Sequence, residues 1–306
     1  MDAVLAWLLD GDPSIRWQVM THLGSPADAI ADERARVATE GLGAELVRRQ
    51  DPEGTWAGGL YSPKWTSTTY TLLVLWWLGL DPAHPAGRRG VDRLFEGLSS
   101  IAGHPRSKRP EACITGMGVG LGAYFGADRE AVDGAVSWLA DNATPDGGWN
   151  CDAPRTGSRH GSFHTTIIVL EGLQELRRRR PDPTLDRLLD GGWRFLWRHR
   201  MHRSHRTGEV VDGRYLRFSY PPRWHYDLLR GLDHLADAGA PTDPAAAEAI
   251  EVVRQRRRPD GRWLLQNRWP GKTWFEFEQV GRPSRWNTLR ALRVLEWWEA
   301  GVERGA

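Results

Sequence analysis

The stretch Gln50-Asp51-Pro52-Glu53-Gly54-Thr55-Trp56 decides the fold of this sequence, because related copies of it return twice. The copies are Thr144-Pro145-Asp146-Gly147-Gly148-Trp149 and Arg258-Pro259-Asp260-Gly261-Arg262-Trp263. In each, the proline sets φ, the acid can accept bonds from the local backbone, and glycine supplies a positive φ. Each copy is therefore a tight turn, and the tryptophan after it can pack over the end of the preceding helix.

A second recurring element follows each turn and opens an apolar helix. It pairs an aromatic residue with a polar one: Arg16-Trp17-Gln18, Lys64-Trp65-Thr66, Ser162-Phe163-His164, Arg223-Trp224-His225 and Arg285-Trp286-Asn287, with the degenerate copy Glu111-Ala112-Cys113. We predict apolar helices at residues 19–23, 70–80, 114–125, 165–176, 226–235 and 288–298. Amphipathic partners with one charged face are predicted at residues 3–9, 34–49, 91–101, 129–141, 185–199 and 245–257.

Six pairs of an outer amphipathic helix and an inner apolar helix predict an all-α chain closed into an α6/α6 toroid. Each hairpin has roughly fifty residues, as in helical repeat proteins. An open solenoid has the same local pattern, so closure is inferred from the count of six pairs. Residues 214–220 are the best strand candidate, and we interpret them as a loop.

The first turn has the full Gln-x-x-x-Gly-x-Trp pattern, and the other two keep its Gly-x-Trp end. This resembles the QW repeat of the squalene–hopene cyclase and protein prenyltransferase superfamily, and small bacterial squalene-cyclase-like proteins in particular. The resemblance covers residues 34–300 and implies one α/α-toroid domain over 1–306, with a short first hairpin at 1–33. It also implies a cavity for an apolar, isoprenoid substrate.

Two family motifs are missing from this sequence: the Asp-x-Asp-Asp acid of class II cyclases and the Asp-Asp-x-x-Asp element that binds magnesium and diphosphate. Protonating an alkene needs a very strong, desolvated acid, so squalene-type cyclisation is disfavoured.

One position follows the aromatic residue at each inner-helix start and reads Gln18, Thr66, Cys113, His164, His225 and Asn287. In a toroid these starts share one rim of the cavity. Cys151 lies in the loop that leads to His164. Thiolates and imidazoles are preferred ligands of zinc, so Cys113, Cys151, His164 and His225 are the candidate ligands of a Zn²⁺ ion. The structural alternative stays open, since cysteines pack as small apolar residues and histidines cap helices.

The resemblance supports a zinc site at this rim, because protein prenyltransferases hold a catalytic zinc with an Asp, a Cys and a later His. Cys151 and Asp152 followed by His225 loosely match that order, although the family has an Asp-x-Cys arrangement. We carry over the zinc site and not its ligand assignment. Asp152 and Asp227 are the candidate acid–base groups beside it.

The aromatic residues at the helix starts have two interpretations. Trp65, Phe163, Trp224 and Trp286 are either wedges between neighbouring hairpins or the wall of a substrate cavity. Glu278, in the segment Trp274-Phe275-Glu276-Phe277-Glu278, would line the mouth of that cavity or belong to a lid.

Composition excludes several classes of partner. The 41 Lys and Arg against 39 Asp and Glu leave a net charge of +2, without the clustered excess of a nucleic-acid-binding protein. The basic run from Arg177 to Arg180 is interpreted as a solvated helix end. The longest apolar stretch, residues 70–80, is too short to span a membrane. Two cysteines and an acidic N-terminal start predict a reducing, cytoplasmic location. The sequence carries no signal for an oligomeric state.

Three functions remain open. The first is a cyclase- or prenyltransferase-like enzyme, without the class II acid, that acts on an apolar isoprenoid, with zinc as its candidate cofactor. The second is a non-catalytic toroid that binds a lipid or metabolite. The third is an α/α-barrel enzyme that acts on carbohydrate, with tryptophans stacked on sugar rings and paired carboxylates as acid and base.

Overall fold

The computed structural model describes residues 2–98, 101 and 110–305, and over these residues the chain is all-α. Their extended segments make isolated β-bridges, such as Trp56 with Gly59, and no named strand. The strand candidate at 214–220 begins as a 3-10 helix, η2 (Gly213–Leu216), and continues as a loop, as predicted. Within the described part of the chain, no helix combines the length and the apolar character needed to cross a membrane.

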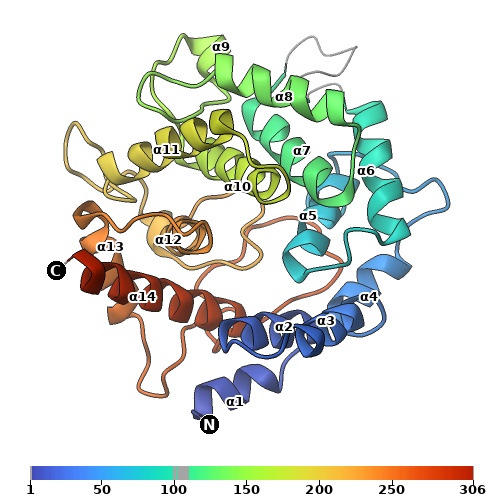
Figure 1. Ribbon diagram of the computed structural model, residues 1–306, viewed down its shortest axis with the longest axis horizontal. Coiled ribbons are helices and arrows are strands. Elements are labelled where there is room, and N and C mark those ends of the chain that lie inside the picture. The colour runs from blue at the N-terminus through green and yellow to red at the C-terminus, as the bar shows by residue number, and fades with distance from the viewer. Residues whose placement is uncertain (1, 99–100, 102–109, 306) are drawn as a thin grey trace.

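The helices at the six predicted inner positions surround the centre of the molecule (Figure 1). They are α2 (Pro13–His22), α5 (Thr68–Leu78), α7 (Ala112–Phe125), α10 (Phe163–Arg179), α12 (Leu228–Asp237) and α14 (Arg285–Gly305). Six further helices pack outside them: α1 (Ala3–Leu9), α4 (Gly41–Arg48), α6 (Pro85–Gly97), α8 (Arg129–Asp141), α11 (Pro183–Arg198) and α13 (Ala247–Gln255). Short elements connect them: α3 (Ala27–Ala35), α9 (Ala153–Thr156), η1 (Arg36–Ala38) and η3 (Pro244–Ala246).

The first and last inner helices lie side by side, so the inner layer returns to its start. Helix α2 packs against α14, and Arg293 donates to the side-chain oxygen of Gln18 at 3.3 Å. On its other side, α2 reaches α5 through the indole N–H of Trp17, which donates to the Leu78 carbonyl at 2.8 Å. The contacts continue from α5 to α7, α10, α12 and α14.

Helices α7 and α10 approach each other most closely among these neighbours because glycines face each other between them. A Cβ atom added to Gly172 would lie 2.2 Å from the Gly116 carbonyl oxygen. Since real Cβ atoms do not come so close, a larger residue at this position would push the two helices apart.

The three turn tryptophans make the same pair of hydrogen bonds in all three repeats. Each indole N–H donates at 2.8 Å to a carbonyl ten residues earlier: Trp56 to Leu46, Trp149 to Leu139 and Trp263 to Val253. Each backbone N–H of these tryptophans donates to a threonine hydroxyl at the start of the next inner helix: Thr68, Thr166 and Thr288. All six side chains are buried. The turn therefore clamps an outer helix to the next inner helix.

These threonines correct the alignment of the last repeat. Counting back two residues from Thr68 and Thr166 gives Thr66 and His164, as aligned in the sequence. Counting back two residues from Thr288 gives Trp286. The residue equivalent to Thr66 and His164 is therefore Trp286, and the predicted position, Asn287, is one residue too late. The hydroxyl that binds the turn, rather than the aromatic residue, sets the register of the repeat.

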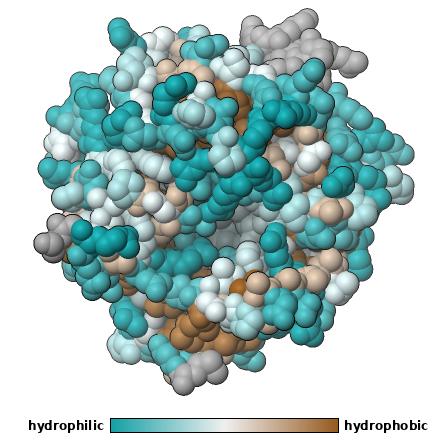
Figure 2. Space-filling model, viewed as in Figure 1, coloured by the Kyte–Doolittle hydropathy of each residue, from teal (hydrophilic) through white to brown (hydrophobic). Residues whose placement is uncertain are grey.

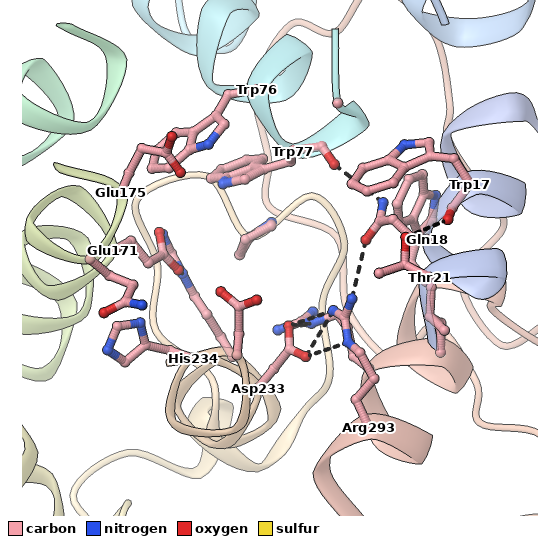
Figure 3. Close-up of a pocket in the computed structure, with 18 of the residues that line it drawn as sticks. Trp17, Gln18, Thr21, Trp76, Trp77, Glu171, Glu175, Asp233, His234 and Arg293 are labelled. Atoms are coloured by element: carbon pink, nitrogen blue, oxygen red, sulfur yellow. Dashed lines mark hydrogen bonds and ion pairs between the residues drawn. The ribbon is translucent and has the colours of Figure 1, made fainter. Parts of the chain in front are cut away.

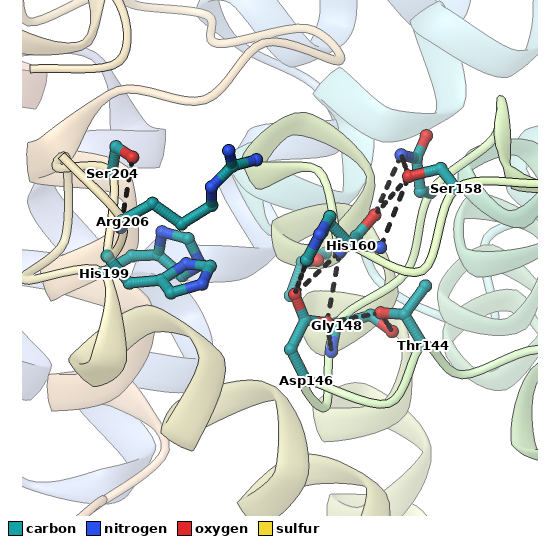
Figure 4. Close-up of polar contacts among 12 residues, drawn as sticks. Thr144, Asp146, Gly148, Ser158, His160, His199, Ser204 and Arg206 are labelled. Carbon is teal, nitrogen blue, oxygen red and sulfur yellow. Dashed lines mark hydrogen bonds and ion pairs between the residues drawn. The ribbon is translucent and has the colours of Figure 1, made fainter.

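The acid of the second turn binds local backbone, as its chemistry predicts. Asp146 accepts from the Thr144 hydroxyl at 2.6 Å and from the Gly161 N–H at 3.0 Å (Figure 4). The His160 imidazole lies 3.7 Å from the same carboxylate. The turn thereby fixes both ends of the loop that carries Cys151.

The predicted outer helix at 34–49 is wrong. Helix α3 ends at Ala35 and α4 begins at Gly41, where φ is +62°. The Asp12 carboxylate accepts from the Leu42 N–H at 2.9 Å and occupies the place that a Cβ at residue 41 would need. The outer helix predicted at 91–101 corresponds to α6, which begins earlier, at Pro85, and ends at Gly97. Residues 99–100 of the predicted helix lie outside the described residues.

We predict that Thr166→Val destabilises the protein by about 1–3 kcal/mol, because the buried Trp149 N–H loses its acceptor while side-chain shape is kept. Urea unfolding followed by circular dichroism measures this. Thr68→Val and Thr288→Val should give losses of similar size, and Thr207→Val, at an exposed threonine, should change stability by less than about 0.5 kcal/mol. Equal effects at Thr166 and Thr207 would contradict the clamp.

Candidate functional site

A central pocket of about 660 Å³ opens on one face of the molecule. Figure 2 shows this hollow, with hydrophilic residues gathered around it. All six inner helices contribute to its lining: α5 and α7 near their C-terminal ends, α10 from its middle onward, α2 and α12 with residues of both halves, and α14 near its N-terminal end. The volume falls within the range of small-molecule sites. The site is predicted at the N-terminal ends of these helices, whereas most of the pocket lies nearer the C-terminal ends, α14 excepted.

Charged side chains dominate the wall of this pocket. Six arginines and four carboxylates line it, and the carboxylates are Glu171, Glu175, Asp233 and Asp237. Arg178 and Arg179 are among the arginines: they are exposed in the last turn of α10, as predicted, and they also border the pocket. Most of these charges are paired across helices or along one helix (Figure 3).

The ion pairs hold the carboxylates in place. Arg230 of α12 is 3% exposed. Its guanidinium donates to both carboxylate oxygens of Glu171, on the neighbouring helix α10, at 2.7 Å each. Asp233 accepts from Arg293 at 2.9 Å, and Glu175 accepts from Arg179 at 2.7 Å. Each of the four carboxylates therefore has a guanidinium beside it that fixes its position.

Positive charge is in excess in the pocket. Arg290 and Arg293 share the single carboxylate of Asp233. Arg34 has no carboxylate partner among the described residues: it donates to the Gly79 carbonyl at 2.9 Å and to the Tyr124 hydroxyl at 2.7 Å. Its guanidinium lies 5.0 Å from the centre of the Trp17 ring. The pocket thus offers cationic donors that an anion could engage.

Aromatic rings form the rest of the wall. Trp17, Trp76 and Trp77 lie together on one side of the pocket (Figure 3). On another side, Trp286 stacks on Tyr220 with ring centres 4.2 Å apart and planes within 8°. Indole and phenol rings give an apolar body or a planar group a surface to pack against.

Two neutral polar groups complete the pocket. Burial lowers the pKa of His234 to about 4, and its Nε2 accepts from the indole N–H of Trp193 at 3.1 Å. The side-chain oxygen of Gln174 is buried and has no partner among the described residues. The site therefore combines fixed charges with uncharged hydrogen-bonding groups.

The two candidate acid–base residues lie outside this pocket. Asp152 is exposed and pairs with Arg155 at 2.8 Å. Asp227 is fully buried and caps α12, where it accepts from the backbone N–H groups of Arg230 at 2.9 Å and Ser219 at 3.1 Å. Burial raises the pKa of Asp227. Its contacts fit a structural role at the start of the helix.

Of the candidate cavity aromatics, Trp286 lines the pocket, and Trp65, Phe163 and Trp224 do not. Trp65 is 3% exposed, and its indole donates to the Pro270 carbonyl at 2.9 Å. Phe163 packs on the rings of Phe195 and Tyr226. These are wedge contacts. Glu278 lines a small separate cavity, and burial raises its pKa to about 6.

The two cysteines do come together, and a residue that the sequence analysis did not select joins them. The ligand atoms of Glu111, Cys113 and Cys151 lie within 4.8 Å of one another, and no other such group occurs in the described parts of the chain. Cys151 Sγ accepts from the Cys113 backbone N–H at 3.2 Å and from the Thr165 hydroxyl at 3.5 Å. Hydrogen bonds, chiefly from the Cys113 thiol, lower the pKa of Cys151 to about 7.

His164 and His225 are not part of this group, although their rings are neighbours at 5.4 Å. His164 Nδ1 accepts from the Tyr226 backbone N–H at 2.8 Å. His225 is stacked between Trp224 and Trp269, at 3.6 and 3.4 Å. The sequence signal for Glu111 was available: Glu111-Ala112-Cys113 places a carboxylate two residues before a cysteine.

No protein-family model and no curated protein matches the chain. Among solved structures, the chain is similar to a variant of the type II terpene cyclase MstE from Scytonema in complex with geranylgeranyl dihydroxybenzoate, with 14% identity and a TM-score of 0.33. The similarity covers 89% of this chain and 97% of that one. For the apo enzyme the identity is 15% and the TM-score 0.29, over 90% and 99% of the two chains. Similarity at this level does not assign an activity.

We predict that acid weakens the fold between about pH 6.5 and 4. Burial lowers the pKa of both His164 and His234 to about 4, so the unfolded chain binds more protons in this window and stability falls as pH falls. Each imidazole contributes a slope of at most about 1.4 kcal/mol per pH unit. Urea unfolding at several pH values should show a shallower slope for His234→Gln. A slope for His234→Gln equal to that of the wild type would contradict the prediction.

Proposed function

We propose that this chain binds an organic anion with an apolar body in the central pocket of a single α6/α6-toroid domain. The observation that carries the proposal is the excess of arginine over carboxylate in a pocket that also presents tryptophan rings. An anionic group would bind at Arg34, Arg290 and Arg293, and the apolar body would pack on Trp76, Trp77 and Trp286.

The charged wall disfavours a wholly apolar ligand. Filling the pocket with a neutral hydrocarbon would strip water from the guanidinium groups and give them no new partner, which is costly. An anion instead offers arginine two parallel hydrogen bonds. The resemblance of the repeat suggests an isoprenoid ligand. Among isoprenoids, a diphosphate ester offers an anionic group for the arginines and an apolar chain for the tryptophans of the pocket wall.

Binding fits this pocket better than cyclisation or sugar hydrolysis. Each carboxylate in the described lining has an arginine partner, so none of them lies alone in the apolar setting that a general acid for an alkene or a glycosidic oxygen would need. We therefore favour the second of the three functions, a non-catalytic toroid that binds a lipid or metabolite. The isoprenoid expected as a substrate in the first function becomes the proposed ligand. A cytoplasmic location is part of this proposal.

Three probes test the ligand class: geranylgeranyl diphosphate, geranylgeraniol and inorganic diphosphate. Tryptophan fluorescence is a direct readout because Trp17, Trp76, Trp77 and Trp286 line the pocket. We predict that the diphosphate ester binds at least about tenfold tighter than the alcohol, since charge-assisted bonds contribute about 1.5–3 kcal/mol. Equal affinity for ester and alcohol, or no binding of the ester, would refute the proposal.

Variants localise the anionic group. Arg34→Gln should weaken the ester by about tenfold and leave the alcohol unchanged, because the charge is lost and the pocket shape is kept. Arg36→Gln is the matched control two residues away, where the guanidinium is exposed and pairs with Glu40 outside the pocket. Circular dichroism reports whether either variant alters the helices.

A second candidate function is supported by the group of Glu111, Cys113 and Cys151. Two thiolates and a carboxylate suit zinc, and a fourth position would be open to water or a ligand. Glu111 would take the place assigned to His164 and His225 from the sequence. A zinc ion held there would act as a Lewis acid or keep the thiolates reactive. The hydrogen bonds from Thr165 and the Cys113 backbone orient the Cys151 sulfur.

Metal analysis of protein purified without chelator tests this site, with about one zinc per chain expected. Cys151→Ala and Glu111→Gln should lower the zinc content while helix content stays the same. Asp152→Asn is the matched control. Asp152 is next to Cys151 in the sequence, but its carboxylate pairs with Arg155 rather than facing the two sulfurs, so this variant should keep the metal. Binding should weaken on acidification, since thiolates must be deprotonated. Metal-free protein that takes up no added zinc would exclude the site.

A further inference from the structure

Arg223 carries a buried charge that the described residues do not neutralise. Its side chain is 5% exposed, and its guanidinium lies over the rings of Trp65 at 5.7 Å and Phe277 at 6.0 Å. No carboxylate in the described part of the chain pairs with it; the groups that interact with its charge are the phenols of Tyr220 and Tyr70. Burial lowers the pKa of Arg223 to about 10, so it stays cationic at neutral pH.

Two small cavities flank this guanidinium. One, of about 20 Å³, is bounded by Tyr220, Arg223 and Trp269, and the other, of about 10 Å³, by Trp65, Tyr70 and Arg223. Each has room for about one water-sized particle. The hydroxyl of Tyr220 and the indole N–H of Trp269, which border the larger cavity, are buried without a hydrogen-bond partner. This cavity therefore offers two unused donors beside Arg223.

We propose that Arg223 holds a small monatomic anion, of halide size, in the cavity it shares with Tyr220 and Trp269. A buried unpaired charge is strongly unfavourable, and an anion supplies the missing opposite charge. It also accepts from the phenol and the indole at once. A water molecule would use these donors and leave the net positive charge uncompensated.

This site is separate from the central pocket and does not depend on the function proposed for it. Tyr220 forms the partition: it borders both spaces, and its ring stacks on Trp286. Glu278 borders the same cavity, but it is not among the groups that act on the charge of Arg223. Its Oε1 accepts from the Arg285 N–H at 2.6 Å, and its Oε2 is buried without a hydrogen-bond partner.

Thermal unfolding in sodium bromide, sodium chloride and sodium gluconate at equal ionic strength tests the site without any organic ligand. Gluconate is too large for the cavity. We expect bromide and chloride to raise the Tm of the wild type by about 2–5 °C over gluconate, because an ion that binds only the folded chain stabilises it. Anomalous diffraction from bromide-containing crystals should show a peak beside the Arg223 guanidinium.

Arg223→Met removes the charge and should abolish the halide-dependent rise in Tm, with a Tm in gluconate equal to or above that of the wild type. Tyr220→Phe should reduce the rise, because one donor is lost. Arg268→Met is the control: this arginine borders the same cavity but is half-exposed and pairs with Glu276, so the full rise should remain. The same Tm in all three salts, or a halide effect that persists in Arg223→Met, would overturn the proposal.

Discussion

The clamp made by each turn tryptophan is the interaction on which the rest of the structure depends. It joins the end of an outer helix, the turn and the start of the next inner helix through two buried hydrogen bonds, as Trp149 does with Leu139 and Thr166. A purely apolar contact would let these segments slide. Here a slide would leave an indole N–H and a backbone N–H unpaired in the core, which is costly. The clamp therefore fixes the step from one hairpin to the next, and with it the space that the inner helices enclose.

The lengths of the connections determine which end of that space stays open. From the second hairpin on, the links at the C-terminal ends of the inner helices are short: α7 ends at Phe125 and α8 begins at Arg129, and α10 ends at Arg179 and α11 begins at Pro183. The links at their N-terminal ends are long, as between Arg198 of α11 and Leu228 of α12, or Gln255 of α13 and Arg285 of α14. The long loops cover the N-terminal ends of the inner helices and fill the space there with aromatic side chains such as Trp65 and Trp269, both of which are buried. Short loops cannot cover the other end, so the pocket lies there.

The repeat was predictable because turn chemistry and apolar periodicity are local properties of a sequence. Helix α8 has the predicted bounds, and α7 differs by two residues at its start. The site was less predictable because it depends on which end is open, and the cavity was expected at the end where His164 and Trp65 lie. Loop lengths, which are visible in the sequence, could have corrected this. The break before Gly41 was not predictable, since it depends on the Asp12 carboxylate, a contact between distant positions.

Arginines at the ends of inner helices have a different role in a ring than on an isolated helix. The run from Arg177 to Arg180 is a solvated helix end, and around an open centre its exposed Arg178 and Arg179 also border the pocket. Such charges are tolerated there because partners hold them, as Glu171 holds Arg230 across α10 and α12. Held charges lose little side-chain entropy when a ligand binds. The clamped hairpins thus present an already ordered set of charges, so an anion of the proposed kind would meet guanidinium groups that are fixed before it arrives.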